Sequence, residues 1–329
     1  MRIESINLIN FRKFERLHLM FEDGLNNIFG GNGTGKSSVL EAIAYLSIPR
    51  SFRNSPDRYL VRWGSDFFTL QGKILDSTSH DIAITFQLPS SKRISVDGKR
   101  IRKYSQLMET FTCMAFSTGD YAIIDAPPED RRRLFDRMIS LMDHKYFVYL
   151  IRYRKVLRQK NMALKRGLPV NMWNRQLKEL AHYIVKVRRE IVQLLNQKTD
   201  SRFTIEYMDT LKDRDYDELL DEEMARGFTL AGPHRDDFVF LINGRPMKYY
   251  ASEGERRIFY LQLIVAFRGI IAQRTGREPV VVLDEPGNVL DEKTFGKFIE
   301  SLRGQVIIAS LHPVKGAHNI PLHEMGNPL

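Results

Sequence analysis

Hydrophobic and polar residues alternate along much of the N-terminal third of the chain, with the two-residue period of strands that bury one face. An Asp97-Gly98 pair marks a hairpin turn inside the last of these segments. Later segments are shorter and more uniformly apolar, which is typical of strands buried on both faces. Alternating strands are predicted over 2–9, 16–21, 67–75, 81–88 and 93–101, and further strands over 112–116, 238–242, 280–283 and 305–310.

The middle of the chain changes to the longer period of amphipathic helices. A helix is expected from Pro127, because paired prolines there precede acidic first-turn residues. Heptads follow over 146–164 and 173–194, separated by a turn at 166–169. They predict an antiparallel helical hairpin with arms of about 30 Å or a little more. Another long helix is expected over 252–274.

The order of these elements predicts an α/β fold, because strands that alternate with helices form largely parallel sheets. At 329 residues, the chain suits one large or two moderate domains. The segments on either side of the helical region are expected to fold together into one body. We expect residues 1–120 and 225–329 to form its two halves, with residues 121–224 as an inserted basic helical lobe.

The formal net charge of +10 is concentrated in this lobe. Residues 131–200 hold 18 Lys and Arg against 5 Asp and Glu, which is a net +13 and leaves −3 for the rest of the chain. Such an excess favours a polyanionic partner such as nucleic acid, although a charge run is also typical of a solvated helix face. Candidate DNA contacts are Arg50, Arg53, Arg131, Arg154, Arg158, Lys165 and Arg188.

Other features of composition narrow the class of protein. No apolar run approaches the ~18 residues of a membrane span, and the N-terminal segment lacks the apolar block of a signal peptide. The single cysteine, Cys113, lies in an apolar segment, so neither a disulfide nor a cysteine–histidine metal cluster is expected. We therefore predict a cytoplasmic protein with no membrane partner.

The most specific motif is GGNGTGKSS, which follows LNNIF and precedes VLEAIAYL. Its glycines let backbone N–H groups converge on phosphate oxygens, and the helix that starts near Gly35 adds its positive end. Lys36 would reach the β- and γ-phosphates, and Ser37 would hold Mg²⁺. The alternative is a turn that only joins a strand to a helix. The expected ATP contacts are Gly30, Asn32, Gly33, Thr34, Gly35, Lys36, Ser37 and Ser38.

Two carboxylates, Asp284 and Glu285, end a buried strand near the C-terminus. Beside a P-loop, Asp284 can hold Mg²⁺ and Glu285 can polarise the attacking water. The alternative is an acidic turn before Pro286. Asp291, further along, would cap the next helix or touch a second subunit. For Arg12, in the turn after the first strand, a phosphate, DNA and solvent all remain open.

The stretch ASEGERR opens the long helix after residue 250. Ser252 and Glu255 form an S-x-x-E capping box, which is a complete structural explanation by itself. A serine hydroxyl together with Gly254 at a helix N-terminus is also a binder of the γ-phosphate.

Several motifs occur in the order seen in the RecF family, which are SMC-like, ABC-type ATPases. They are LINFRKF, GGNGTGKSS, RSFRNS, PPEDRRRLFD, GPHRDDFVFLING, ASEGERR and VVVLDEP followed by LDE. The resemblance covers essentially the whole chain and implies an ABC/SMC-type ATPase head with an inserted hairpin lobe. It also implies slow, DNA-stimulated ATP hydrolysis with Mg²⁺, in which Lys36, Asp284 and Glu285 act with Ser252 of the opposite subunit in an ATP-dependent homodimer.

The same resemblance implies a role in gap repair. The expected partners are double-stranded and gapped DNA, together with RecR, which acts with RecO in loading RecA. Some residues depart from the family pattern. Ser117 lies in the stretch expected to sense the γ-phosphate but lacks the usual proline nearby, and Glu255-Arg256 replaces a more usual Gln-Gln. Glu285 stands where many relatives carry aspartate. His312 lies one residue beyond the usual switch histidine, and a surface histidine is the alternative there.

Other function classes were weighed against this one. An ABC transporter's ATP-binding subunit would have a short helical domain between P-loop and signature, whereas 216 residues separate Lys36 from Ser252 here. A small-molecule P-loop kinase would need neither signature nor heptads. SMC-like proteins of double-strand-break repair have far longer coiled coils. A scaffold that binds ATP without hydrolysing it is a further alternative. Measuring phosphate release with and without DNA would distinguish it from an ATPase.

Overall fold

The computed structural model describes residues 1–212, 214–286 and 292–323. The chain forms two compact units, one built from residues 1–120 and 271–329 and the other from residues 121–270. Residues from both ends of the chain therefore share the first unit. Helix α9 (Glu253–Thr275) begins in the second unit and ends in the first.

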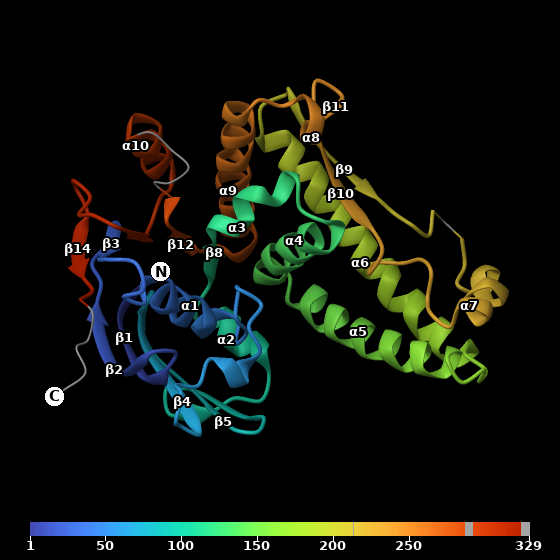
Figure 1. The fold of residues 1–329 in the computed structure, drawn as a ribbon, viewed down its shortest axis with the longest axis horizontal. Helices are drawn as coiled ribbons and strands as arrows, with labels where there is room; N and C mark the ends of the chain where they lie inside the picture. Colours follow the sequence, from blue (N-terminus) through green and yellow to red (C-terminus); the bar gives the residue numbers. More distant parts are fainter. Residues whose placement is uncertain (213, 287–291, 324–329) are drawn as a thin grey trace. The chain divides into compact units, whose positions relative to one another are not determined.

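The first unit contains an antiparallel six-stranded sheet in the order β2-β1-β4-β5-β6-β7 (Figure 1). The alternating segments become its strands because each strand buries every second side chain, as Ile82, Ile84 and Phe86 show in β5. The strands are β1 (Arg2–Phe11), β2 (Phe14–Met20), β4 (Phe67–Leu75), β5 (Ser79–Gln87), β6 (Ser91–Val96) and β7 (Lys99–Arg100).

The second sheet of this unit is parallel throughout and has the order β14-β3-β13-β12-β8. Every position of β12 is buried, which explains its uninterrupted apolar sequence. The parallel sheet predicted from the sequence is thereby confirmed. Its strands are β3 (Leu25–Phe29), β8 (Cys113–Phe116), β12 (Val280–Asp284), β13 (Val306–Ser310) and β14 (His318–Pro321).

Helix α1 (Lys36–Ser47) packs against strands of both sheets. After its first turn it is apolar nearly all round, as a helix between two layers must be. Gly72 of β4 permits a close approach, because a Cβ there would lie 2.3 Å from Leu46 Cδ1. The remaining helices described in this unit are η1 (Asp57–Tyr59), α2 (Tyr104–Thr110) and α10 (Glu292–Ser301), and α3 (Thr118–Tyr121) crosses into the second unit.

The second unit is mainly helical, with the predicted hairpin formed by α5 (His144–Leu164) and α6 (Asn171–Lys198) (Figure 1). Heptad residues such as Tyr153 and Ile184 are buried. None of the helices in the described residues is both long and apolar enough to cross a bilayer. The other elements are η2 (Ala122–Ile124), α4 (Pro128–Met142), β9 (Phe203–Met208), η3 (Asp217–Leu219), α7 (Leu220–Arg226), β10 (Asp237–Ile242), β11 (Arg245–Pro246) and α8 (Met247–Tyr250).

The boundary between the units differs from the one expected at residue 225. Strand β10 pairs antiparallel with β9, which lies within the expected helical lobe, and β11 then pairs with β10. These pairings hold residues 225–270 in the second unit, so the boundary falls at residue 271. Ser252 therefore belongs to the second unit and not to the unit that contains the P-loop.

Arg188 is only 1% exposed, so the prediction that it faces outward toward DNA is wrong. Helix α6 packs on α5 and also on β9, and Arg188 lies beside Tyr207 of β9. Its guanidinium donates hydrogen bonds to Asp136 Oδ1 at 2.8 Å, Pro233 O at 2.8 Å and Tyr146 Oη at 2.9 Å. The heptads account for only one of the two buried faces of α6.

Two other expected DNA contacts also pair with carboxylates. Arg131 donates to both oxygens of Asp237, at 2.8 and 2.6 Å, and its side chain is 14% exposed. Arg154 donates to Asp136 Oδ2 at 3.0 Å. Part of the lobe's positive charge is thus neutralised inside the second unit. Arg50, Arg158 and Lys165 have exposed side chains.

Replacing Arg188 with methionine is expected to lower the free energy of unfolding by about 3–5 kcal/mol, because it leaves buried Asp236 without its cation and removes the buried cation of Asp136, whose other partner, Arg154, is 42% exposed. Urea unfolding followed by circular dichroism measures the loss. Arg189→Met is the matched control, since the neighbouring Arg189 side chain is 52% exposed. Equal unfolding midpoints for the two variants would contradict the structural role of Arg188.

Candidate functional site

The loop between β3 and α1 has a backbone that only glycine tolerates at its end. Gly35 has a φ of 102°, and a Cβ there would lie 2.4 Å from Phe14 Cζ. Gly35 is also the N-cap of α1, and no side chain caps the first N–H groups of this helix. Those donors and the positive end of the helix dipole are therefore available to an anion.

Lys36 and Ser37 lie where a phosphate-binding loop needs them. Lys36 is 5% exposed, and its Nζ donates to the carbonyl oxygens of Gly30 and Gly31, at 2.8 Å each. Thr34 Oγ1 donates to Gly31 O at 3.0 Å, which closes the loop. The ammonium group is thus held over the centre of the loop, where a phosphate would sit.

Ser37 joins the P-loop to the acidic strand end through one hydrogen bond. Its Oγ donates to Asp284 Oδ1 at 2.9 Å. The two residues meet because β3, β13 and β12 are parallel neighbours, so their carboxyl ends share one edge of the sheet. Burial raises the pKa of Asp284, and the hydrogen bond from Ser37 opposes that rise. A hydroxyl beside a carboxylate is a donor set that suits Mg²⁺.

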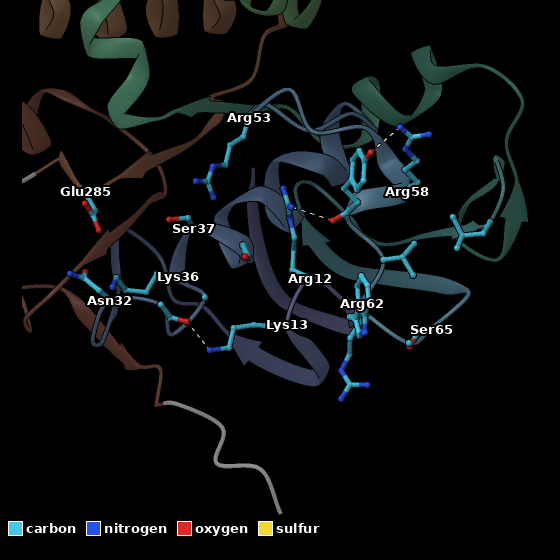
Figure 2. A pocket seen from close by; sticks show the side chains of 18 residues that line it. Arg12, Lys13, Asn32, Lys36, Ser37, Arg53, Arg58, Arg62, Ser65 and Glu285 are labelled. Atoms are coloured by element: carbon cyan, nitrogen blue, oxygen red, sulfur yellow. Dashed lines mark hydrogen bonds between the residues drawn. The ribbon is translucent and has the colours of Figure 1, made fainter.

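Glu285 follows in a left-handed backbone conformation, with a φ of 50°. Its N–H donates to Ala309 O of β13 at 3.1 Å, which holds the turn against the sheet. Positive φ is unfavourable for a residue with a side chain, and such strain is concentrated at functional sites. The turn brings the Glu285 side chain to the pocket wall, close to Ser37 and Lys36 (Figure 2).

These residues line a cavity of about 670 Å³ that lies wholly within the first unit. Its volume is within the range of small-molecule sites. Three segments form most of its walls: the P-loop, the β1–β2 turn and residues 53–65 (Figure 2). The lining residues outside the P-loop include Arg12, Lys13, Arg53, Arg58, Tyr59, Val61, Arg62, Trp63, Leu88 and Glu285.

Sequence reasoning missed several of these residues, among them Lys13 and Trp63. Lys13 Nζ donates to Gly33 O at 2.7 Å, so a second lysine stands at the P-loop. Trp63 is 97% exposed, although an indole of this size usually packs against other side chains. Lys13 lies in the LINFRKF motif and Trp63 in none, and no local pattern links either residue to a nucleotide site. The cavity forms only when the β1–β2 turn and residues 53–65 fold beside the P-loop.

Arg53 was predicted to contact DNA, but the structure places it in the wall of this cavity. Burial raises the pKa of Asp284, and the positive charge of Arg53 opposes that rise, as expected for a cation that faces the acidic strand end. Figure 2 shows its guanidinium on the same side of the pocket as Ser37. An arginine in this position suits a phosphate ligand.

Glu41 of α1 is fully buried and organises two walls of the cavity. Its carboxylate accepts two hydrogen bonds from the Arg12 guanidinium, at 2.8 and 3.0 Å. It also accepts a short hydrogen bond from Ser51 Oγ, which in turn accepts one from the Arg53 N–H at 3.1 Å. Arg12 completes the network by donating to Ser55 Oγ at 2.8 Å. One buried carboxylate therefore ties both cation-bearing loops to the P-loop helix.

The remaining candidates lie elsewhere in the fold. Ser252 and Gly254 start helix α9 in the second unit, and Ser252 forms its predicted capping box with Glu255: Ser252 Oγ donates to Glu255 Oε2 at 2.7 Å. Ser117 Oγ donates to Asp120 Oδ2 at 3.1 Å. His312 is exposed, and its carbonyl accepts from Asn27 Nδ2 at 3.1 Å. Asp291 lies outside the described residues.

Comparison with known proteins shows the family of this chain. Residues 2–317 match the model described as the RecF/RecN/SMC N terminal domain. The chain belongs to the RecF/RecN/SMC family. The DNA replication and repair protein RecF of Chlorobaculum tepidum is 30% identical over 352 residues, which cover 96% of this chain and 95% of that protein. RecF of Clostridium novyi is 31% identical over 327 residues, covering 92% and 91%.

Solved structures support the same membership. A structure of the recombination mediator protein RecF with ATPrS, in the RecFOR pathway, superposes with a TM-score of 0.90 at 28% identity, covering 98% of this chain and 96% of that one. The corresponding RecF-ATP structure gives a TM-score of 0.87 at 28% identity, covering 95% and 92%. An Smc head domain from Pyrococcus furiosus matches at 0.53 and 16% identity, covering 98% and 94%, which shows a shared fold. The resemblance to RecF seen in the motifs is confirmed.

Replacing Glu41 with glutamine is expected to weaken ATP binding by about tenfold, because Arg12 and Ser51 lose a charged acceptor and hydrogen bonds to charged groups contribute ~1.5–3 kcal/mol. Isothermal titration calorimetry measures the affinity. Glu15→Gln is the control, since Glu15 pairs with Arg62 of the same cavity but is 68% exposed. If Glu41→Gln folded and bound ATP like the wild type, the network would not position the site.

Proposed function

We propose that this RecF-family chain is an ATP-dependent DNA-binding protein of recombinational DNA repair. In this proposal it dimerises around two ATP molecules and acts on duplex DNA at single-strand gaps. The observation that carries the proposal is the contact between Ser37 and Asp284 beside the cavity that Glu285 lines. This group provides a cation site and a carboxylate for water at one edge of a phosphate-binding loop.

The chemistry assigned to each residue follows from its position. The N–H groups at the start of α1 and the Lys36 ammonium bind the β- and γ-phosphates. Ser37 and Asp284 would hold Mg²⁺, which neutralises charge on those phosphates when bound. Glu285 orients the attacking water as the general base of a slow hydrolysis.

The nucleoside end of ATP is assigned to the wall formed by residues 59–65. Val61, Trp63 and Leu88 give this part of the cavity an apolar surface, whereas the P-loop end is polar. An exposed indole offers a flat face on which a purine can stack. Because the cavity lies within one unit, a single subunit can bind ATP before any dimer forms.

The second half of the ATP site is assigned to another copy of the chain. Ser252 lies exposed at the N-terminus of a long helix, in a unit that contributes no residue to the described cavity. A serine hydroxyl and the positive end of a helix dipole together suit a γ-phosphate. Two such helices, one from each copy, would close on two bound ATP molecules. ATP binding and dimer formation would then be linked.

Duplex DNA is assigned to helix α5, which contains no Asp or Glu. Arg152, Lys155 and Arg158 are exposed and spaced three residues apart, so they share one side of the helix. Within the described part of the chain these three cations form no ion pair, in contrast to Arg131, Arg154 and Arg188. Unpaired surface cations in a row are suited to successive phosphates.

The biological setting is proposed from the relatives. The two RecF structures are described as belonging to the RecFOR pathway, and the sequence relatives are described as DNA replication and repair proteins. We therefore assign to this chain a partnership with RecR, acting with RecO in loading RecA at gapped DNA. DNA binding would stimulate ATP turnover by favouring the closed dimer.

Glu285→Gln is expected to trap an ATP-bound dimer, because it removes the base and leaves the phosphate contacts in place. Light scattering coupled to size-exclusion chromatography, at saturating ATP, measures the molar mass of the variant. Adding Ser252→Ala to the same chain should return it to a monomer. A monomeric Glu285→Gln variant that still binds ATP would contradict the sandwich and leave a lone nucleotide binder.

Replacing Arg152, Lys155 and Arg158 together with glutamine is expected to lower DNA affinity and to reduce the salt slope, log K against log[salt], by about 3, since each phosphate contact contributes ~0.9. Fluorescence anisotropy with a duplex, at salt concentrations from about 50 to 200 mM, gives both quantities. The matched control is Arg189→Gln, whose guanidinium is already paired with Asp209 at 2.7 Å. An unchanged slope in the triple variant would remove α5 as the DNA-binding surface.

A further inference from the structure

The start of α9 is held by two neighbouring side chains, and only one of them belongs to the capping box. Glu255 accepts hydrogen bonds from both the N–H and the Oγ of Ser252, at 2.8 and 2.7 Å. The next residue, Arg256, takes no part in the capping box. Its guanidinium reaches back beside the same turn.

Arg256 contacts three acceptors from three segments of the second unit. Its Nη1 pairs with Asp125 Oδ2 at 2.5 Å, just after η2. Its Nη2 donates to Lys248 O of α8 at 2.7 Å. Its Nε donates to Ala251 O, the carbonyl directly before Ser252, at 3.3 Å. Each of the three guanidinium nitrogens therefore has an acceptor.

This arrangement restrains the backbone on the N-terminal side of Ser252. Guanidinium is planar and rigid, so acceptors bound to its three nitrogens are held in a fixed relation to one another. Here those acceptors lie in α8, in the peptide before Ser252 and in the 121–125 segment. A second link, from Tyr121 Oη to Glu253, joins the same segment to the first turn of α9. The side chain of Arg256 is 20% exposed, which limits competition from water.

We propose that Arg256 is a positioning residue for Ser252. It fixes the angle at which the Ser252 hydroxyl and the N-terminus of α9 approach the nucleotide of a second copy. Glu255 orients the serine side chain, and Arg256 orients the backbone that carries it. The inference rests on the proposed dimer, and it assigns a function to a side chain that neither the P-loop site nor the capping box uses.

The test compares Arg256→Gln with Arg257→Gln, which removes the adjacent arginine of the same helix turn. The Nε of Arg257 lies 3.7 Å from Glu253, and its side chain is 41% exposed. For each variant, ATP affinity is measured by calorimetry on the monomer at low protein concentration. ATP-dependent dimerisation is measured separately by sedimentation. Ser252→Ala and the Ser252→Ala/Arg256→Gln double variant complete a mutant cycle.

Arg256→Gln is expected to bind ATP like the wild type, because the cavity lies in the first unit. Its dimer should be weaker by about tenfold, as loss of hydrogen bonds from a charged group predicts. Arg257→Gln should dimerise like the wild type. The double variant should dimerise no more weakly than Ser252→Ala alone, because Arg256 acts through Ser252. A general structural role would instead add its loss to that of Ser252→Ala.

Two results would overturn the inference about Arg256 without refuting the proposed dimer. One is wild-type dimerisation of Arg256→Gln when Ser252→Ala dimerises poorly. The other is a double variant whose loss of dimer affinity is the sum of the two single losses. Wild-type dimerisation of Ser252→Ala would refute the proposed sandwich instead, so the two failures are distinguishable. If Arg256→Gln does not fold, Asp125→Asn replaces it in the same cycle. That variant removes the ionic contact and keeps both carbonyl contacts of Arg256, and it should give a smaller, equally non-additive loss.

Discussion

The nucleotide site depends on the parallel alignment of β3, β13 and β12. Because the three strands run in the same direction, the P-loop and the acidic strand end emerge at one edge of the sheet. The result is a 2.9 Å hydrogen bond between Ser37 and Asp284, residues that are 247 positions apart in the chain. Asp284 and Lys36 are buried at this edge beside apolar side chains. Electrostatic contacts are stronger there than in water, because the local dielectric constant is lower.

Buried charge then extends that arrangement in both units. In the first unit, Glu41 connects the P-loop helix to the loops that carry Arg12 and Arg53, so the positions of these two loops depend on one carboxylate. In the second unit, Arg188 and Asp136 connect α6 to α4. A buried ion can persist only with all its partners in place. Each network therefore favours one packing arrangement of the helices and loops that it connects.

Charge in the second unit is divided between structure and surface. Arg131 and Arg188 are engaged by acidic residues of the GPHRDD stretch, whereas Arg152, Lys155 and Arg158 of α5 remain exposed. A count of charges along the chain treats both groups alike, although only the exposed group is available to a polyanion. At the start of α9, Glu255 accepts hydrogen bonds from Ser252, and Arg256 binds Asp125 and the carbonyl just before Ser252. In the sequence alone, this Glu-Arg pair is only a departure from the family pattern.

Local patterns in the amino-acid sequence were sufficient for the strands, the helical hairpin, the P-loop and the acidic strand end, because periodicity, glycine placement and capping act over a few residues. The family resemblance added the expectation that the P-loop and the acidic strand end act together with Ser252 of a second copy. Tertiary structure alone decided the rest. It brought Lys13, Arg53 and Trp63 to one cavity, buried Arg188 on the second face of α6, and moved residues 225–270 into the helical unit. The physical reason is that strand pairing, a second packing face and desolvation join residues far apart in sequence, which no local pattern records.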